Sequence, residues 1–237
     1  MAPRGCGRKV RAFCPASLAL TYNHYMDDFD WVMSTGEKTV CVALLHIRLS
    51  KAINRNLELL QRLQRRGSLA HVAWLARNLL ELRIWVDYCS LSIDNAQDFY
   101  FDAIRDLVDL NKKTTTGLDA ETNRRLEKAK TILGTDRPAH KFKDVRDAAK
   151  EAGLQTFYSD NCKVLSKFVH PTALSIVAPV GEAAEAEIRK QFVEAGRGYA
   201  GEAVKTLDSS CVGDVYRKYR KSIERVNLEQ PKDKRLF

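Results

Sequence analysis

The sequence predicts an all-α protein that forms a single bundle of about seven to eight helices. Three observations lead to this fold class. Hydrophobic residues recur with the 3.6-residue period of an α-helix in most long segments. The 237 residues include only 12 glycines and 6 prolines, so few positions would interrupt a helix. Hydrophobic residues make up 45% and charged residues 29% of the chain, which is typical of a protein that buries a sizeable core.

The chain shows no internal repeat and no linker that would divide it, so we predict one helical domain over residues 36–227. A basic N-terminal arm and lead-in should occupy residues 1–35, and a flexible tail residues 228–237. The arm has no acidic residue before position 27, and one hypothesis is that it lies upstream of the natural start, because Met26-Asp-Asp opens a more ordinary sequence.

The first predicted helix covers residues 37–66, because leucine and isoleucine recur on one face from Leu45 to Leu63. Gly67 and Ser68 should end this helix and cap the next one.

A second helix is predicted over residues 71–91, which are apolar on nearly every side, as in a buried helix. A third is expected over residues 95–111. The later predicted helices cover residues 119–133, 142–152, 156–169, 182–207 and 212–227. Residues 173–180 are apolar with β-branched side chains and fit either a strand or a packed loop.

His170 stands at the end of the helix predicted over residues 156–169 and is followed by proline, so this helix should stop at or before it. Ser159, Lys163, Ser166 and His170 are spaced to form one stripe on that helix. A histidine there would serve as a general acid or base near neutral pH, with Ser166 positioning a substrate or water. The alternative is a capping or core histidine bonded to a carbonyl.

Arg77 and Glu81 are four residues apart on the apolar helix and share a face with Trp74, Ile84 and Tyr88. We therefore expect the ion pair to be buried, and buried charges persist only when they are paired. In the functional interpretation, Arg77 meets a phosphate or carboxylate while Glu81 orients it or a nearby histidine. In the structural alternative, the pair is an internal tie between helices.

The net charge of +9 favours polyanionic partners such as nucleic acid, with simple solubility as the alternative. Five cations share one side of the first predicted helix: Arg48, Lys51, Arg55, Arg62 and Arg66. The last helix adds three further candidates for nucleic-acid binding: Arg217, Arg220 and Lys221. Tyr216 and Tyr219 lie among these cations and would either stack on bases or form an ordinary core stripe.

Several classes of chemistry have no signature in the sequence. The six cysteines are scattered singly without zinc-like spacing, which indicates free thiols in a reducing, cytoplasmic compartment. No run of about 20 apolar residues would span a membrane. Dinucleotide-binding, Walker, zinc-protease and EF-hand motifs are absent, so we expect neither a cofactor nor a metal.

Three segments carry a resemblance to a known family: Arg77-x-x-x-Glu81, Phe142-Lys-Asp-Val followed by Gly153, and Tyr158-x6-Leu-Ser166-x-x-x-His170-Pro. Over about residues 40–180 this combination resembles an uncharacterised bacterial family known only as a domain of unknown function. That family is similar in outline to the HEPN helical domains. The resemblance implies an RNA-binding or RNA-cleaving unit of a toxin or antiviral system.

The HEPN hallmark is an arginine, then four to six residues, then a histidine, with the arginine holding phosphate and the histidine moving a proton without metal. His170 departs from it, because residues 163–165 upstream contain no arginine. The literal match is Arg66 or Arg65 with His71, interrupted by a Gly-Ser break that disrupts a fixed helical geometry. HEPN-like chemistry at His170 would therefore need Arg77 to supply the cation from another helix.

The basic surfaces predict an RNA-binding helical protein, and the resemblance implies that it is a metal-independent ribonuclease of a bacterial defence or toxin system, although whether it is an enzyme stays open at this point. The candidate catalytic residues are Arg77, Glu81, Ser166 and His170. The alternative is a non-enzymatic protein-interaction or nucleotide-sensing module in which the Arg/Glu/His network is structural. The expected partner is RNA or another nucleic acid, with a homodimer left open.

Overall fold

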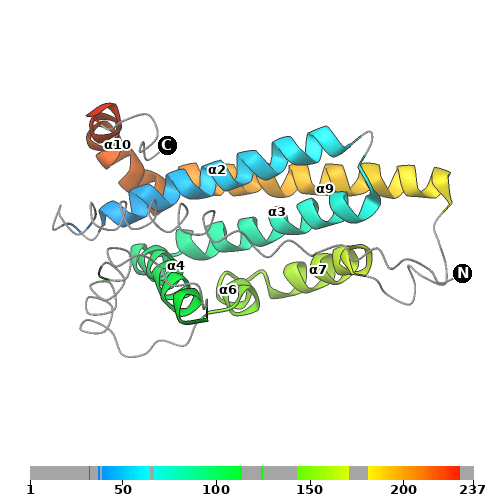
Figure 1. The fold of residues 1–237 in the computed structure, drawn as a ribbon, viewed down its shortest axis with the longest axis horizontal. Helices are drawn as coiled ribbons and strands as arrows, with labels where there is room; N and C mark the ends of the chain where they lie inside the picture. Colours follow the sequence, from blue (N-terminus) through cyan, green and yellow to red (C-terminus); the bar gives the residue numbers. More distant parts are fainter. Residues whose placement is uncertain are drawn as a thin grey trace, which may run out of the picture.

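A computed structural model describes residues 39–64, 67–113, 143–170 and 181–229, together with Val32, Glu37 and Arg124. All regular secondary structure in these ranges is α-helical, which confirms the predicted fold class. The described ranges contain seven helices: α2 (Val40–Leu63), α3 (Leu69–Ser90), α4 (Ile93–Lys113), α6 (Val145–Glu151), α7 (Gln155–Val169), α9 (Glu182–Ser209) and α10 (Cys211–Glu229). They pack as one bundle (Figure 1).

Helix α3 runs through the middle of the bundle. It lies between α2 and α9 on one side and α4, α6 and α7 on the other, and it contacts all five (Figure 1). Its side chains from Val72 to Cys89 are largely buried, so the prediction of a buried helix is confirmed. The central position follows from its composition, since a helix that is apolar on nearly every side needs neighbours all around it.

The helix ends follow local chemistry. The Ser68 side chain accepts a hydrogen bond from the backbone N–H of His71 and caps α3, as predicted. Asp144 caps α6, which explains why this helix begins at Val145 and not at the predicted residue 142. Gly153 adopts a φ of +71° after α6, a conformation that suits glycine. These residues separate the short α6 from α7.

Helix α7 ends at Val169, and His170 takes an extended conformation with φ −101° and ψ 146°. A residue before proline is pushed out of the α region, so this helix stops where the sequence predicted. The C-terminal helix continues to Glu229, slightly past the predicted start of a flexible tail at residue 228. Val32, which falls in the predicted lead-in, is helical and buried in the core.

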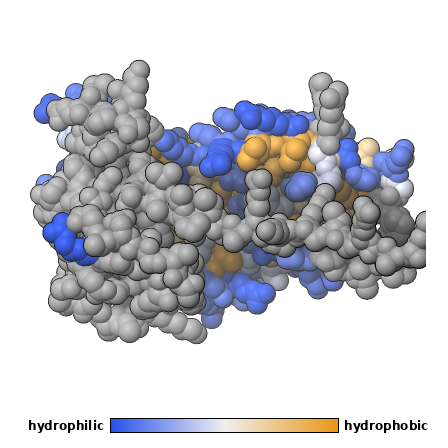
Figure 2. All heavy atoms as spheres, in the orientation of Figure 1, coloured by the Kyte–Doolittle hydropathy of each residue, from blue (hydrophilic) through white to orange (hydrophobic). Residues whose placement is uncertain are grey.

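The predicted helix over 119–133, apart from Arg124, and the predicted strand or loop over 173–180 lie outside the described residues. Among the helices that the structure describes, none is long and apolar enough to cross a membrane. Figure 2 shows one face of the molecule, on which hydrophilic residues surround a small hydrophobic patch. Large hydrophobic side chains are exposed at four described positions: Leu59, Trp74, Leu91 and Val164.

Candidate functional site

Helices α3 and α7 bring the predicted site residues together. Arg77 at the first half of α3 contacts His170 at the end of α7, whereas Arg83, further along α3, lies over the ring of Phe157 near the start of α7. The two helices are therefore antiparallel. This packing places residues 93 positions apart in the sequence within hydrogen-bond distance of each other.

The ion pair between Arg77 and Glu81 forms within α3 as the spacing predicted. The Arg77 Nε donates to Glu81 Oε1 at 2.9 Å. The side chains remain 27% and 29% exposed, so the pair is half-buried and not buried as expected. The reason is that the face they share turns from the core at Ile84 and Tyr88 to the surface at Trp74.

The contact between Arg77 and His170 is the central geometric feature of the site. Arg77 Nη1 lies 3.4 Å from His170 Nε2. A guanidinium has donors only, so it is the donor in this contact and Nε2 accepts in its unprotonated form. Burial acts to lower the pKa of Arg77, but the charge and the hydrogen bond of Glu81 outweigh it and raise this pKa, which keeps Arg77 a cation.

Of the expected alternative, a capping or core histidine bonded to a carbonyl, the capping part fits, because His170 is the C-cap of α7, whereas the core part does not. Its side chain is exposed, and its ring contact is with Arg77. Its backbone N–H closes the last turn of α7 by donating to the Ser166 carbonyl at 3.3 Å. The imidazole is therefore open to solvent beside a fixed cation.

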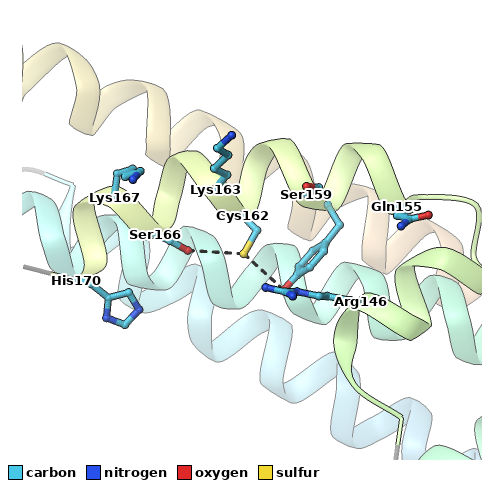
Figure 3. Close-up of a pocket in the computed structure, with 9 residues that line it drawn as sticks. Arg146, Gln155, Ser159, Cys162, Lys163, Ser166, Lys167 and His170 are labelled. Carbon is cyan, nitrogen blue, oxygen red and sulfur yellow. Dashed lines mark hydrogen bonds between the residues drawn. The ribbon is translucent and has the colours of Figure 1, made fainter. Parts of the chain in front are cut away.

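The Ser166 side chain takes part in a chain of hydrogen bonds along α7. Its hydroxyl lies 3.7 Å from the Cys162 thiol, which donates to the Tyr158 hydroxyl at 3.5 Å (Figure 3). Burial raises the pKa of Tyr158, and the hydrogen bond with Cys162 raises it further, so the phenol stays protonated at neutral pH. The described structure shows no hydrogen bond between the side chains of Ser166 and His170.

A cavity of about 690 Å³ lies along α7 and ends at His170 (Figure 3). Its described lining consists of Arg146, Gln155, Tyr158, Ser159, Cys162, Lys163, Ser166, Lys167 and His170. The predicted stripe on α7 is thus one wall of this cavity. The lining includes the cations Arg146, Lys163 and Lys167 and the imidazole of His170. No described lining residue carries a carboxylate.

Sequence reasoning missed four of the cavity residues: Arg146, Gln155, Cys162 and Lys167. Lys167 lies four positions after Lys163, so helical spacing could have added it to the stripe. Gln155 lies four positions before Ser159, so the same spacing could have added it. Arg146 comes from α6, and only the packing of α6 against α7 brings it to this cavity.

The candidate nucleic-acid ridge on α2 is described as far as residue 64, so Arg66 lies outside the described residues. Lys51, Arg55 and Arg62 are exposed, and Arg48 is half-buried. Arg62 lies 3.8 Å from Glu58, a distant pair between exposed side chains. The described part of the ridge is therefore exposed to solvent except at Arg48.

The cations on α10 are more engaged with the protein. Arg217 donates to the Asp208 carbonyl at 2.7 Å and to Asp214 Oδ1 at 2.5 Å, and Arg220 donates to Glu224 at 2.7 Å. Lys221 is exposed.

The two tyrosines of α10 face the rest of the protein. Tyr216 stacks on His46 with ring centroids 4.2 Å apart, and Tyr219 forms hydrogen bonds with Thr39 and Glu37. These contacts favour a packing role of the two tyrosine rings within the protein over stacking on bases.

The literal HEPN spacing falls across a helix boundary. Gly67 and Ser68 separate α2 from α3, and His71 lies exposed in the first turn of α3, where its Nδ1 is 2.9 Å from the Ser68 hydroxyl. The Gly-Ser break therefore interrupts the helix as expected. Metal chemistry has no obvious centre in the described ranges, where no three His, Cys, Asp or Glu side chains converge.

Comparison with known proteins places the chain in a family. No curated protein and no solved structure matches it. Residues 41–186 match the family of unknown function DUF5677. This range is more than half of the 237 residues and includes all of α3 and α7, and hence the Arg77–His170 contact. The chain belongs to DUF5677, a family of unknown function.

Proposed function

We propose that this protein binds RNA and cleaves it without metal at the Arg77–His170 pair, as a HEPN-like unit of a bacterial defence or toxin system. One observation carries the proposal: a guanidinium lies 3.4 Å from an exposed imidazole across two helices, beside a cationic cavity. An arginine that binds phosphate and a histidine that moves a proton supply the charge stabilisation and the general base that phosphodiester transfer in RNA uses.

In the proposed reaction, Arg77 NH groups hold a non-bridging oxygen of the scissile phosphate, and Glu81 fixes the guanidinium through Nε. His170 Nε2 accepts the proton of the ribose 2′-hydroxyl, whose oxygen attacks phosphorus. The bond to the 5′-oxygen breaks, and this oxygen takes a proton from water, while His170 later releases its own proton to solvent. The products are a 2′,3′-cyclic phosphate and a 5′-hydroxyl.

Ser166 has a supporting role in this proposal. Its hydroxyl bonds with Cys162 and lines the cavity one turn before His170, so it would orient the strand or a water and not attack phosphorus.

The four described cysteines are free thiols, which supports the proposed reducing, cytoplasmic location. The enzyme would act there as a monomer or a homodimer.

A second candidate function is a non-enzymatic interaction or nucleotide-sensing module. It is favoured by the contact of Arg77 with His170, which joins α3 to the end of α7 even without chemistry, while Glu81 holds Arg77 in place within α3. The same cavity would then bind a nucleotide without converting it chemically.

The decisive experiment is incubation of the protein with total RNA in EDTA, comparing wild type with His170→Ala and His71→Ala. His71 is the matched control, because it is an exposed histidine on α3 that completes the literal HEPN spacing. We expect cleavage by wild type and His71→Ala and none by His170→Ala. Equal cleavage by wild type and His170→Ala, or no cleavage by either, rejects the ribonuclease and leaves the second candidate.

The ridge on α2 is tested separately by the double substitution Arg55→Glu and Arg62→Glu. Both side chains are exposed, so the bundle should tolerate the change. The slope of log K against log salt is negative, and each lost phosphate contact reduces its magnitude by about 0.9 for duplexes and about 0.7 for single strands. RNA retention should therefore weaken and its salt dependence flatten, whereas unchanged binding would assign these arginines to solvent alone.

A further inference from the structure

Trp74 is an indole that the packing of the bundle leaves half uncovered. It is 49% exposed, whereas Leu75 and Leu79 on the same helix are 2% and 0% exposed. Within the described ranges its ring has no aromatic, cation–π or hydrogen-bond partner. A single exposed apolar side chain is ordinary on a protein surface, but an exposed indole one turn from a cation and an imidazole is placed where it can stack on a base.

Trp74 lies next to the proposed cleavage site. It precedes Arg77 by three residues on α3, a spacing that places the Cβ atoms about 5–6 Å apart on one face. Because α3 and α7 are antiparallel and Arg77 reaches His170 at the end of α7, Trp74 lies about one turn beyond that end. The cavity runs the other way, from His170 back along α7 towards Gln155. Along the helix axes, the position of Trp74 and the cavity therefore lie on opposite sides of the Arg77–His170 pair.

The cavity side is suited to an extended chain of phosphates. Arg146, Lys163 and Lys167 line it without any carboxylate among the described lining residues (Figure 3). From Ser159 to His170 the wall extends roughly 16 Å along α7 at the helical rise of about 1.5 Å per residue. That length accommodates several phosphates of one strand.

We infer that the site takes unpaired RNA, with one base stacked on Trp74, the adjoining phosphate on Arg77 beside His170, and the strand continuing into the cavity along α7. The inference rests on the proposed function and names its substrate class. A base inside a duplex has both faces covered by its neighbours, so only a single strand, loop or bulge can offer a face to the indole.

Binding is measured in a His170→Ala background, which prevents cleavage, with a labelled single-stranded RNA and its duplex followed by fluorescence anisotropy. Removal of an aromatic platform weakens single-strand binding about 5- to 150-fold, which is the expected effect of Trp74→Ala. Trp74→Phe keeps a ring and should retain most of the affinity. Val164→Ala is the matched control, since Val164 is an exposed apolar residue of α7 that does not line the cavity.

A second readout is the quenching of tryptophan emission on binding. The chain has three tryptophans, and a stacked base should quench the emission of Trp74, so the change on binding should shrink in Trp74→Phe. The combination of tight single-strand binding, weak duplex binding and these Trp74 effects supports the inference.

The contrary outcomes separate this inference from the proposed function. Duplex bound as tightly as single strand, or Trp74→Ala bound as tightly as Val164→Ala, overturns the inference even if wild type still cleaves RNA through His170. If wild type neither binds nor cleaves any RNA, the proposed function fails and this inference fails with it.

Discussion

Gly196 of α9 provides a sharp test of how the three long helices pack. A Cβ atom on Gly196 would lie 2.5 Å from Leu60 Cδ2 of α2 and 3.4 Å from Leu79 Cδ1 of α3. Both leucines are 0% exposed, so neither side chain can swing into solvent to make room. Gly196→Ala should therefore force the crossing of α2, α3 and α9 apart or push Leu60 out of a favourable rotamer.

The magnitude follows from two opposing effects. Alanine in place of glycine within a helix stabilises it by about 1 kcal/mol. Overpacking of a buried contact costs about 1–3 kcal/mol. The net change for Gly196→Ala is then between neutral and about 2 kcal/mol destabilising.

Gly198→Ala isolates the steric cost. Gly198 is exposed on the same helix, and a Cβ there meets nothing within 4 Å, so only the gain of about 1 kcal/mol applies. Urea unfolding of both variants, at matched m-values, should show Gly196→Ala to be less stable than Gly198→Ala by about 1–3 kcal/mol. Equal stability of the two variants would refute the close approach of α9 to α2 and α3.

Three further predictions concern stability. Asp144→Ala removes the side chain that accepts from the N–H groups of Arg146 and Asp147, so thermal unfolding should show a loss of about 1 kcal/mol; no loss would mean that α6 does not need its cap. Tyr199→Phe removes the hydrogen bond to Asn161 at 2.7 Å between α9 and α7, and urea unfolding should show a loss of about 0.5–1.5 kcal/mol, whereas an unchanged midpoint would contradict a net role for this bond. Burial lowers the pKa of His46, although Asp208 opposes this, so the unfolded chain binds the proton first and stability should fall as pH drops below the ordinary value of 6.5. Urea midpoints at about pH 8 and about pH 5.5 should differ less in His46→Gln than in wild type. An identical difference would show that another group causes the loss of stability at low pH.

The fold was largely predictable because its signals are local. The apolar period marked the long helices, and the described helix ends agree with the predicted ones within a few residues. Ser68 and Gly153 act on backbone groups within one turn, so their effect can be inferred without knowledge of any neighbour. The start of α6 was placed too early, because the capping role of Asp144 was not recognised.

The candidate site was predictable only in its parts. The pairing of Arg77 with Glu81 and the stripe that ends at His170 follow from helical spacing within one helix. The exposure of the ion pair was mispredicted, because apolar residues on the same face did not reveal that this end of α3 lies at the surface. The two tyrosines of α10 were ambiguous for the same reason, since a ring among cations fits both a surface and a core.

The sequence by itself determined an all-helical bundle, the helix ends and the residues that share a helix face, since these depend on interactions within a few positions of the chain. Only the tertiary structure decided that Arg77 meets His170, that Arg146 joins the wall formed by α7 and that Trp74 stays exposed. The physical reason is that these relations depend on which helices pack together and in which direction. That choice is made by the fit of many side chains across α3, α6, α7 and α9, and no single segment of the chain contains it.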